Sequence, residues 1–391
     1  MDFTLLPLVT AEIASNVYDI KQHTDSLDKA FIKSSANTYF NLTGNSSNPA
    51  LRLRGTSGGN IIRKETGFGI FAQGKALYKN QALLAFRGTA GMLDLVTHSH
   101  LSPKLNQGSQ LVHAGFQKTF DSLFEQVKTA LALRESSIDT IHIVGHSLGG
   151  AIATLYANWI SQHLNMQVKL YTFGSPRVGM DGFSKTLTRR LGADNIHRTY
   201  HRTDIIPMIP LWPYYHTPFN GIDCYLDSPG FPGLNYHSMQ KYKDRVAGQT
   251  SWRSLHRAAP HPVYDQLVKD MFATGSVHKQ IHGGFYLLNR SMTYVFDKLN
   301  QMGLIVIQAV LMAGATAWDL LALTLQKAAS ISLEAHGLIT TLMKQILKTL
   351  GRAITVTSNL TYAFIKAVFD MMNNVLYKTA REALKIVHNA I

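Results

Sequence analysis

The chain has 391 residues but a single cysteine, Cys224, so no disulfide can form within it. Its fold therefore does not require an oxidising compartment. The first residues also lack the basic segment with which a signal peptide begins, and they carry the acidic residues Asp2 and Glu12. We therefore expect a cytoplasmic protein or one exported by a route that needs no signal peptide, with or without membrane association.

Acidic residues are scarce: 24 Asp and Glu stand against 38 Lys and Arg, which gives a formal net charge of +14. A basic surface favours an anionic partner, either nucleic acid or an anionic lipid surface. No signature of a nucleic-acid-binding protein is present, so we favour an anionic membrane surface. Because the basic residues form no long run, a basic protein without an anionic target is the alternative. No cluster with metal-ligand spacing stands out, so we expect no metal and no cofactor.

Proline is absent after Pro262, and the pattern from there on is helical almost throughout. Before it, strand-like runs alternate with helical ones, which predicts a mostly parallel sheet with helices on its faces. We therefore expect an α/β region over residues 1–264 and an all-α region over residues 265–391. The expected strands are 68–72, 81–86, 140–144, 168–173 and 195–200; the expected helices include 1–20 and 116–133, and 37–60 is expected to be loop.

The all-α region leaves two questions open. Leu304–Trp318 is apolar apart from Gln308, which is borderline for a membrane span, and a buried helix hairpin is the commoner explanation. The later helices, residues 339–350 and 362–386, are amphipathic with lysines on the polar side. They suit an anionic lipid interface and an ordinary helix-packing unit equally well. These lysines are Lys344, Lys348, Lys366, Lys378 and Lys385.

Residues 205–236 are rich in proline and aromatic residues, which excludes regular secondary structure over most of the segment. A long apolar loop is uncommon unless it is functional. We interpret it as the wall of an apolar pocket; a loop packed flat on the sheet is the alternative.

The most informative motif is Gly-x-Ser-x-Gly at Gly145–Gly149, between the β-type run Thr140–Val144 and the helical run Ala151–Ile160. A serine in a tight strand-to-helix turn is held in a strained conformation, with its hydroxyl exposed at a helix N-terminus. There the helix favours developing negative charge. This context predicts that Ser147 is a nucleophile.

A serine nucleophile needs a histidine base and an acid that orients the histidine, and hydrolases of this type supply them in the order Ser, Asp or Glu, His. Asp204 follows a predicted strand end and is the preferred acid over Asp181, Asp194 and Asp223. His237 comes after the acid, where a loop meets a helix, and is the preferred base, with His216 second. The remaining candidates for the base are His201, His256 and His261.

At this point the sequence resembles the class 3 lipases, the fungal-type triacylglycerol lipase family with bacterial members. The resemblance runs from about residue 65 to about residue 245 and has six parts in the right order. These are Ala85–Thr89, Val112–Phe116, Gly145–Gly150, Thr172–Gly179, Arg202–Pro207, and His237–Met239 with Tyr242. The disulfides of the secreted fungal enzymes are absent.

The resemblance implies an α/β-hydrolase fold with a triad of Ser147, Asp204 and His237. It also implies an oxyanion hole formed by Thr89 and by the backbone N–H of Leu148. Between Thr89 and His113 it implies a lid, with Met92, Leu93 and Val96 on one side of a short helix. The family's lid carries a tryptophan near this place, and this chain has none there.

These observations predict a serine carboxylic-ester hydrolase acting on membrane lipids or glycerolipids, as a phospholipase A1 or a lipase. The positive charge favours phospholipid cleaved at the sn-1 ester, and a bacterial toxin injected into another cell would fit. A cytoplasmic triacylglycerol lipase or esterase is one alternative. A non-catalytic membrane-binding protein on a hydrolase scaffold is another. A protein inhibitor or chaperone is a further candidate partner.

Overall fold

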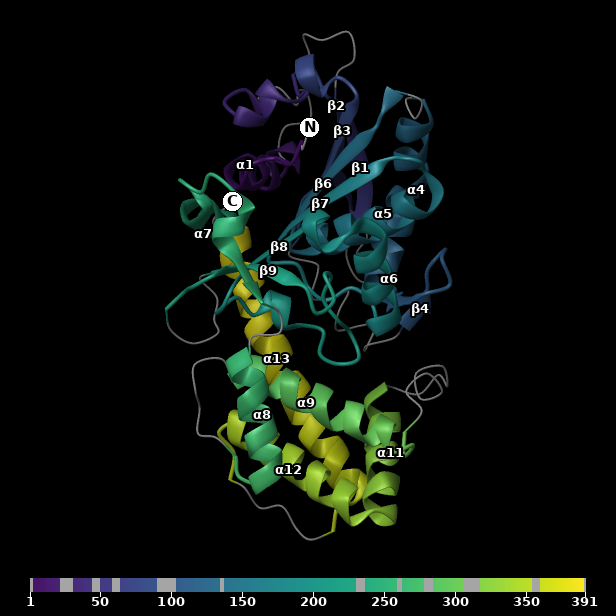
Figure 1. Ribbon diagram of the computed structural model, residues 1–391, viewed down its shortest axis with the longest axis vertical. Coiled ribbons are helices and arrows are strands. Elements are labelled where there is room, and N and C mark those ends of the chain that lie inside the picture. The colour runs from purple at the N-terminus through teal and green to yellow at the C-terminus, as the bar shows by residue number, and fades with distance from the viewer. Residues whose placement is uncertain are drawn as a thin grey trace.

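The protein is described by a computed structural model in which an α/β part lies above a group of helices (Figure 1). The described residues are 3–21, 31–43, 50–57, 64–89, 103–133, 137–229, 236–258, 262–277, 284–305, 317–353 and 359–389.

An eight-stranded sheet forms the centre of the α/β part, in the spatial order β1-β2-β3-β6-β7-β8-β9-β10. Strands β3 to β9 of this order pair in parallel, whereas β1, β2 and β10 pair antiparallel at the edges. The mostly parallel sheet is therefore confirmed. The strands are β1 (Leu51–Ser57), β2 (Lys64–Gln73), β3 (Gln81–Phe86), β6 (Thr140–His146), β7 (Gln167–Phe173), β8 (Ile196–His201), β9 (Ile222–Leu226) and β10 (His256–Ala258).

The prediction of loop over residues 37–60 was wrong at its end, where β1 pairs with β2. Its sequence, LRLRGTS, alternates apolar and basic residues, a period-2 pattern that the neighbouring glycines and serines obscured. A separate two-stranded sheet is formed by β4 (Pro103–Leu105) and β5 (Leu111–His113).

Helices cover both faces of the large sheet (Figure 1). One face carries α4 (Ala114–Ala132), α5 (Leu148–His163) and α6 (Asp181–Leu191), and α5 packs on both β6 and β7. The other carries α1 (Pro7–Asn16) and α7 (Met239–Val246), which also contact each other. The sheet is thus buried on both sides, which explains why β3 and β6 are buried along their whole length.

The remaining helices pack together below the sheet: α8 (Pro262–Thr274), α9 (Gly284–Gln301), α11 (Ala317–Ile331), α12 (Leu333–Thr349) and α13 (Tyr362–Asn389). Their apolar faces are buried in one cluster, to which α12 contributes Ile339 and Ile346 and α13 contributes Phe369 and Met372. On the polar side, Lys366 pairs with Asp319 and Asp370. These contacts are those of a helix-packing unit.

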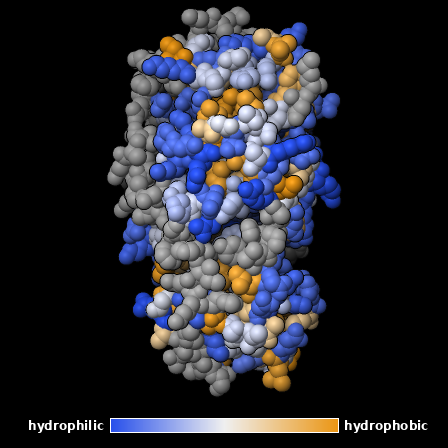
Figure 2. All heavy atoms as spheres, turned by 60° about the vertical axis from the view of Figure 1, so that its left-hand side comes forward, coloured by the Kyte–Doolittle hydropathy of each residue, from blue (hydrophilic) through white to orange (hydrophobic). Residues whose placement is uncertain are grey.

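No helix within the described ranges is both long and apolar enough to cross a bilayer. Most of the apolar run 304–318 lies outside the described residues. On the face shown in Figure 2, apolar side chains form separate patches among hydrophilic ones. The turn between α11 and α12 exposes two large apolar side chains, Ile331 (73%) and Leu333 (94%).

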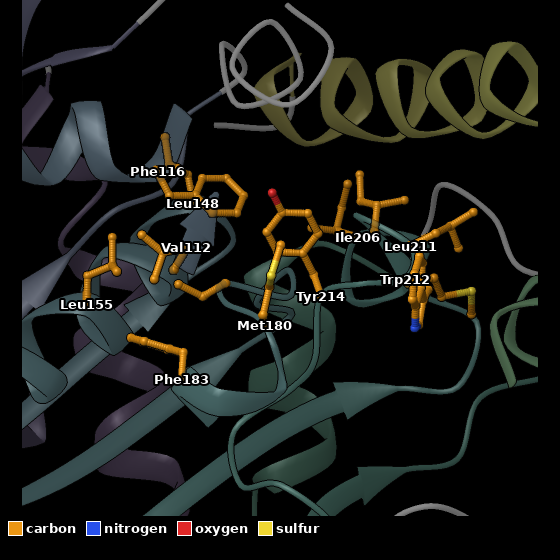
Figure 3. Close-up of a cluster of buried hydrophobic side chains, with 14 of the residues drawn as sticks. Val112, Phe116, Leu148, Leu155, Met180, Phe183, Ile206, Leu211, Trp212 and Tyr214 are labelled. Atoms are coloured by element: carbon orange, nitrogen blue, oxygen red, sulfur yellow. The ribbon is translucent and has the colours of Figure 1, made fainter. Parts of the chain in front are cut away.

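The segment 205–215 connects the two parts of the molecule. Trp212 is 1% exposed, and its ring stacks on Phe296 of α9 with 3.9 Å between centroids. The backbone N–H of Trp212 donates to Asn289 Oδ1 at 3.2 Å. Figure 3 shows Ile206, Leu211, Trp212 and Tyr214 in one buried apolar cluster. The segment was predicted to be the wall of an apolar pocket. It is buried over most of its length, where α9 packs on it, and Trp212, Pro213 and Tyr215 line a cavity between α6 and α9.

Candidate active site

Ser147 lies in the turn between β6 and α5, with φ 56° and ψ −128°. The turn is tight enough that a Cβ on Gly145 would lie 2.2 Å from the Gly149 carbonyl oxygen. A Cβ on Gly149 would lie 2.2 Å from the carbonyl oxygen of Phe86 at the end of β3. Both positions therefore require glycine, and the serine is held in a strained conformation at the carboxyl edge of the sheet.

The structure brings Ser147, His237 and Asp204 together from segments far apart in the sequence. His237 Nε2 lies 2.9 Å from Ser147 Oγ, and His237 Nδ1 lies 2.8 Å from Asp204 Oδ2. His237 and Asp204 are fully buried, and Ser147 is 1% exposed. In this geometry a neutral His237 accepts the serine proton on Nε2 and donates Nδ1–H to the carboxylate.

Three groups hold the Asp204 carboxylate. Its Oδ1 accepts from the Ile206 N–H at 2.9 Å, and its Oδ2 accepts from the Tyr242 hydroxyl at 2.7 Å as well as from His237. Burial raises the pKa of Tyr242 well above its ordinary value, so the phenol keeps its proton and acts as a donor. The carboxylate is thereby fixed in position and direction.

The alternative acids and bases have other partners. His216 donates Nε2–H to the Pro207 carbonyl oxygen at 2.8 Å. Asp223 forms a buried ion pair with Arg198, and Asp181 pairs with Lys185 on the surface. Asp194 lies in a short 3₁₀ turn, His201 packs against Tyr242, and His256 lies on the edge strand β10, whereas His261 is outside the described residues.

The end of β3 meets the serine turn at Gly88. A Cβ on Gly88 would lie 2.8 Å from the Ser147 Cβ, so the backbone just before Thr89 lies against Ser147. The Gly88 carbonyl accepts from Arg87 Nη1 at 2.8 Å, and the Gly88 N–H donates to the Tyr18 hydroxyl at 3.0 Å. This holds the peptide leading to Thr89 beside Ser147, and Leu148 begins α5 on the other side of the serine.

A buried hydrogen-bond chain runs from Gly88 to His237 through Tyr18 and His146. The Tyr18 hydroxyl lies 2.6 Å from His146 Nδ1, and His146 Nε2 lies 2.8 Å from the carbonyl oxygen of His237. Burial lowers the pKa of His146 well below 6.5, so the ring is neutral. Since the His237 carbonyl can only accept, His146 carries its proton on Nε2 and accepts from Tyr18 on Nδ1.

The exposed serine hydroxyl predicted from the motif differs from the structure, in which Ser147 is buried. In Figure 3 the side chains of Ile206 and Tyr214 point toward a helix that crosses this region. Tyr377 of α13 interacts electrostatically with Tyr214, and Leu376 and Ala380 share its apolar cluster. The C-terminal helix thus lies near Tyr214. Residues 90–102, which include the predicted lid, lie outside the described residues.

One group of potential metal ligands emerges that the sequence analysis did not identify. His197 of β8, Cys224 of β9 and His256 of β10 place one ligand atom each within 4.8 Å of one another. The three residues are 27 to 59 positions apart in the sequence but lie on adjacent strands, with Cys224 directly opposite His256. Sequence spacing hides such a group, because only strand pairing creates it.

Comparison with known proteins agrees with this geometry. The model of the family "Lipase (class 3)" matches residues 83–214, from β3 through the serine turn to Tyr214. This segment belongs to the class 3 lipase family. The chain is 31% identical over 166 residues to a secreted mono- and diacylglycerol lipase of Fusarium solani, covering 41% of this chain and 48% of the relative.

A second relative, a phospholipase A1-II of Oryza sativa subsp. indica, is 27% identical over 205 residues, covering 44% of this chain and 52% of the relative. The chain therefore spans about half the length of the curated relatives it matches. Among solved structures, the lipase of Rhizopus microsporus var. chinensis superposes with a TM-score of 0.42 at 21% identity, over 57% of this chain and 75% of that one. With a mostly parallel sheet and a serine in the turn after β6, the class 3 lipase segment has the architecture of an α/β-hydrolase.

Two contacts of the site could not be predicted from the motifs. Tyr18 lies outside the family match and the resemblance, and only the packing of the N-terminal segment brings it to Gly88 and His146. Tyr242 follows His237 by five residues, and no spacing rule assigns its hydroxyl to Asp204.

Proposed function

We propose that this protein is a serine hydrolase that cleaves the carboxylic esters of lipids. The proposal rests on the chain of hydrogen bonds from Ser147 through His237 to Asp204. A serine hydroxyl becomes a nucleophile when it is hydrogen-bonded to an oriented imidazole that can take its proton. The class 3 lipase match over residues 83–214 and the named activities of the relatives support a lipid ester as the substrate.

The reaction proceeds in two halves. His237 Nε2 takes the proton of Ser147 Oγ as the oxygen attacks the ester carbonyl, and the resulting imidazolium is stabilised by Asp204. His237 then gives this proton to the departing alcohol, which leaves an acyl-enzyme. Water, deprotonated by the same ring, attacks the acyl group, and the carboxylic acid is released as Ser147 regains its proton.

The tetrahedral intermediate carries a negative oxygen that needs donors next to the serine. We assign the backbone N–H groups of Thr89 and Leu148 to this role, because both adjoin the Ser147 turn. Tyr18 and Arg87 act as positioning residues, since they hold the Gly88 peptide from both sides. Tyr242 positions Asp204.

Two substrate classes are supported to different degrees. The Fusarium relative is named for mono- and diacylglycerols and the rice relative for phospholipase A1 activity. The net charge of +14 favours a phospholipid with an anionic head group, cleaved at the sn-1 ester. We propose phospholipid as the preferred substrate, with mono- and diacylglycerol as the second candidate. Action as a bacterial toxin on the membrane of another cell is a setting compatible with this preference.

We also propose that residues 1–264 form the catalytic domain and that the helices from residue 265 on dock onto it through the 205–215 segment. The stacking of Trp212 on Phe296 and the hydrogen bond from Trp212 to Asn289 support this arrangement.

The deciding experiment incubates the full chain with vesicles that contain phosphatidylglycerol, phosphatidylcholine and diacylglycerol, and identifies the products by mass spectrometry. We expect 2-acyl lysophospholipid and free fatty acid, and none of either from Ser147→Ala. If fatty acid is released only from diacylglycerol, the preferred substrate is mono- and diacylglycerol and not phospholipid. Equal product from wild type and Ser147→Ala would refute the hydrolase proposal.

A further inference from the structure

A small cavity lies between the class 3 lipase segment and α9, away from the serine. Its volume is about 80 Å³, room for roughly two to three waters or one small oxyanion. The wall from the α/β part includes Arg177, Arg198, His216 and Asp223, whose carboxylate pairs with Arg198. The wall from α9 includes Asn289, Arg290 and Thr293. Arg177 and Arg198 are 4% and 5% exposed. The cavity therefore gathers three guanidinium groups, two of them buried.

The charges around the cavity are not balanced. Arg198 is paired with Asp223 through two hydrogen bonds, and Arg290 is paired with Asp265. Arg177 donates to the carbonyl oxygens of Met208 and Pro210, which supply hydrogen bonds but no negative charge. In the described part of the chain, no carboxylate lies within ion-pair distance of Arg177. A buried charge without a counter-charge is costly, so an anion in this cavity would stabilise the fold.

The neighbouring groups respond to the same positive field. The pKa of Arg177 is lowered to about 9 by burial and by the charges of Arg198 and Arg290. The pKa of His216 is lowered well below 6.5 by burial, and Arg198 and Arg177 lower it further. Guanidinium groups bind the oxygens of phosphate through pairs of N–H donors, which suits a tetrahedral oxyanion better than a spherical ion.

We propose that this cavity binds a phosphate group, held by Arg177, Arg198, Asn289 and Arg290. The phosphate belongs to an inorganic ion or to the head group of a phospholipid. Because donors come from the α/β part and from α9, a bound phosphate ties the helical region to the catalytic one. The site does not depend on the proposed hydrolase chemistry, and it is tested by thermal unfolding rather than by turnover.

The first test measures the melting temperature of the full chain in potassium phosphate and in potassium chloride of equal ionic strength. We expect phosphate to raise the Tm by about 2–4 °C. This rise in Tm should grow with the logarithm of the phosphate concentration once that concentration exceeds the Kd. Arg290→Gln should lose this increment, whereas Arg189→Gln, which removes an exposed arginine of α6, should keep it.

A second variant separates ligand binding from structural damage. Asn289→Asp retains the oxygen that accepts from Trp212 but adds a carboxylate to the cavity wall. We expect its Tm without phosphate to exceed that of wild type and its response to phosphate to vanish, because the carboxylate takes the place of the anion. The proposal would be overturned if phosphate does not raise the Tm of wild type. It would also be overturned if phosphate raises the Tm of wild type, Arg290→Gln and Asn289→Asp equally.

Vesicle flotation then distinguishes the two sources of phosphate. If the head group is the ligand, phosphatidic acid vesicles should retain wild type more than Asn289→Asp, and inorganic phosphate should compete. If the free ion is the ligand, both proteins should float equally while the phosphate increment in Tm remains.

Discussion

The α/β part and the C-terminal helices use their polar residues in opposite ways. Around Ser147, polar side chains are buried and each is tied to several partners: Asp204 accepts three hydrogen bonds, and Tyr18 joins Gly88 to His146. In the helices the buried residues are mostly apolar, and ion pairs such as that of Lys366 with Asp370 are partly exposed. One region is built for directed chemistry, and the other for packing. Single polar changes should therefore reduce activity in the first region, and apolar changes should reduce stability in the second.

The largest effect is expected at the reacting atoms. Ser147→Ala or His237→Ala should lower kcat for a lipid ester by about 10⁴- to 10⁶-fold, because either change removes the activated nucleophile. Turnover of a short p-nitrophenyl ester and of vesicles measures this loss. Ser161→Ala, on the same helix α5, is the control and should retain normal turnover and Tm. If Ser147→Ala keeps one-tenth of the wild-type rate, Ser147 is not the nucleophile.

Asp204→Asn should come next, with a loss of about 10⁴-fold, because an amide can hold the histidine in the wrong tautomer. Tyr242→Phe removes one of three hydrogen bonds to the same carboxylate, and we expect a loss of roughly 10- to 100-fold. The comparison is made in kcat at saturating substrate. Equal losses in the two variants would mean that Tyr242 does more than position the acid.

The packing region should respond in stability. Phe296→Ala removes the ring that stacks on Trp212 and should lower the free energy of unfolding by about 3–5 kcal/mol. Leu333→Ala, at a side chain that is 94% exposed, should leave it within about 0.5 kcal/mol of wild type. Urea titration followed by fluorescence measures both. If Phe296→Ala unfolds as wild type does, the two regions do not share a core at this contact.

A pH test probes burial in the catalytic region. Burial lowers the pKa of His113 to about 3, so this ring stays neutral in the fold while it takes up a proton in the unfolded chain below about 6.5. The contribution of His113 to the free energy of unfolding is fully present above pH 6.5 and decreases as the pH falls below this value. Between pH 7 and 5, wild type should lose on the order of 2 kcal/mol relative to His113→Asn, which does not titrate. Parallel stability curves for the two proteins would show that His113 is not buried as described.

The smallest effect is expected from Tyr18→Phe. The change removes an acceptor for the Gly88 N–H and a donor to His146, and we expect kcat to fall roughly 2- to 10-fold with KM nearly constant. Tyr225→Phe, whose hydroxyl contacts Asp227 at the surface, is the matched control. A rise in KM with kcat unchanged would assign Tyr18 to substrate binding instead of positioning.

The same contrast explains what could be predicted from the sequence. The serine turn and the alternation of strands and helices are local patterns, so the mostly parallel sheet and the position of Ser147 were predictable. The choice of Asp204 over Asp223 rested on its position after a predicted strand end and on the family resemblance, and the structure places Asp204 next to His237. Tyr18, Tyr242 and the cluster of Arg177 with Arg290 arise from long-range packing, which no local spacing encodes. The packing of α9 on the 205–215 segment could not be predicted, because α9 begins about 70 residues later.

The central claim is that one hydroxyl is made reactive by His237 and Asp204. A fluorophosphonate forms a covalent bond with such a serine, and peptide mass spectrometry locates the adduct. With lipid vesicles present, we predict one adduct, on Ser147, formed at a rate that His237→Ala reduces by orders of magnitude. An adduct on another serine, or none on a folded wild-type protein that hydrolyses lipid, would contradict the account.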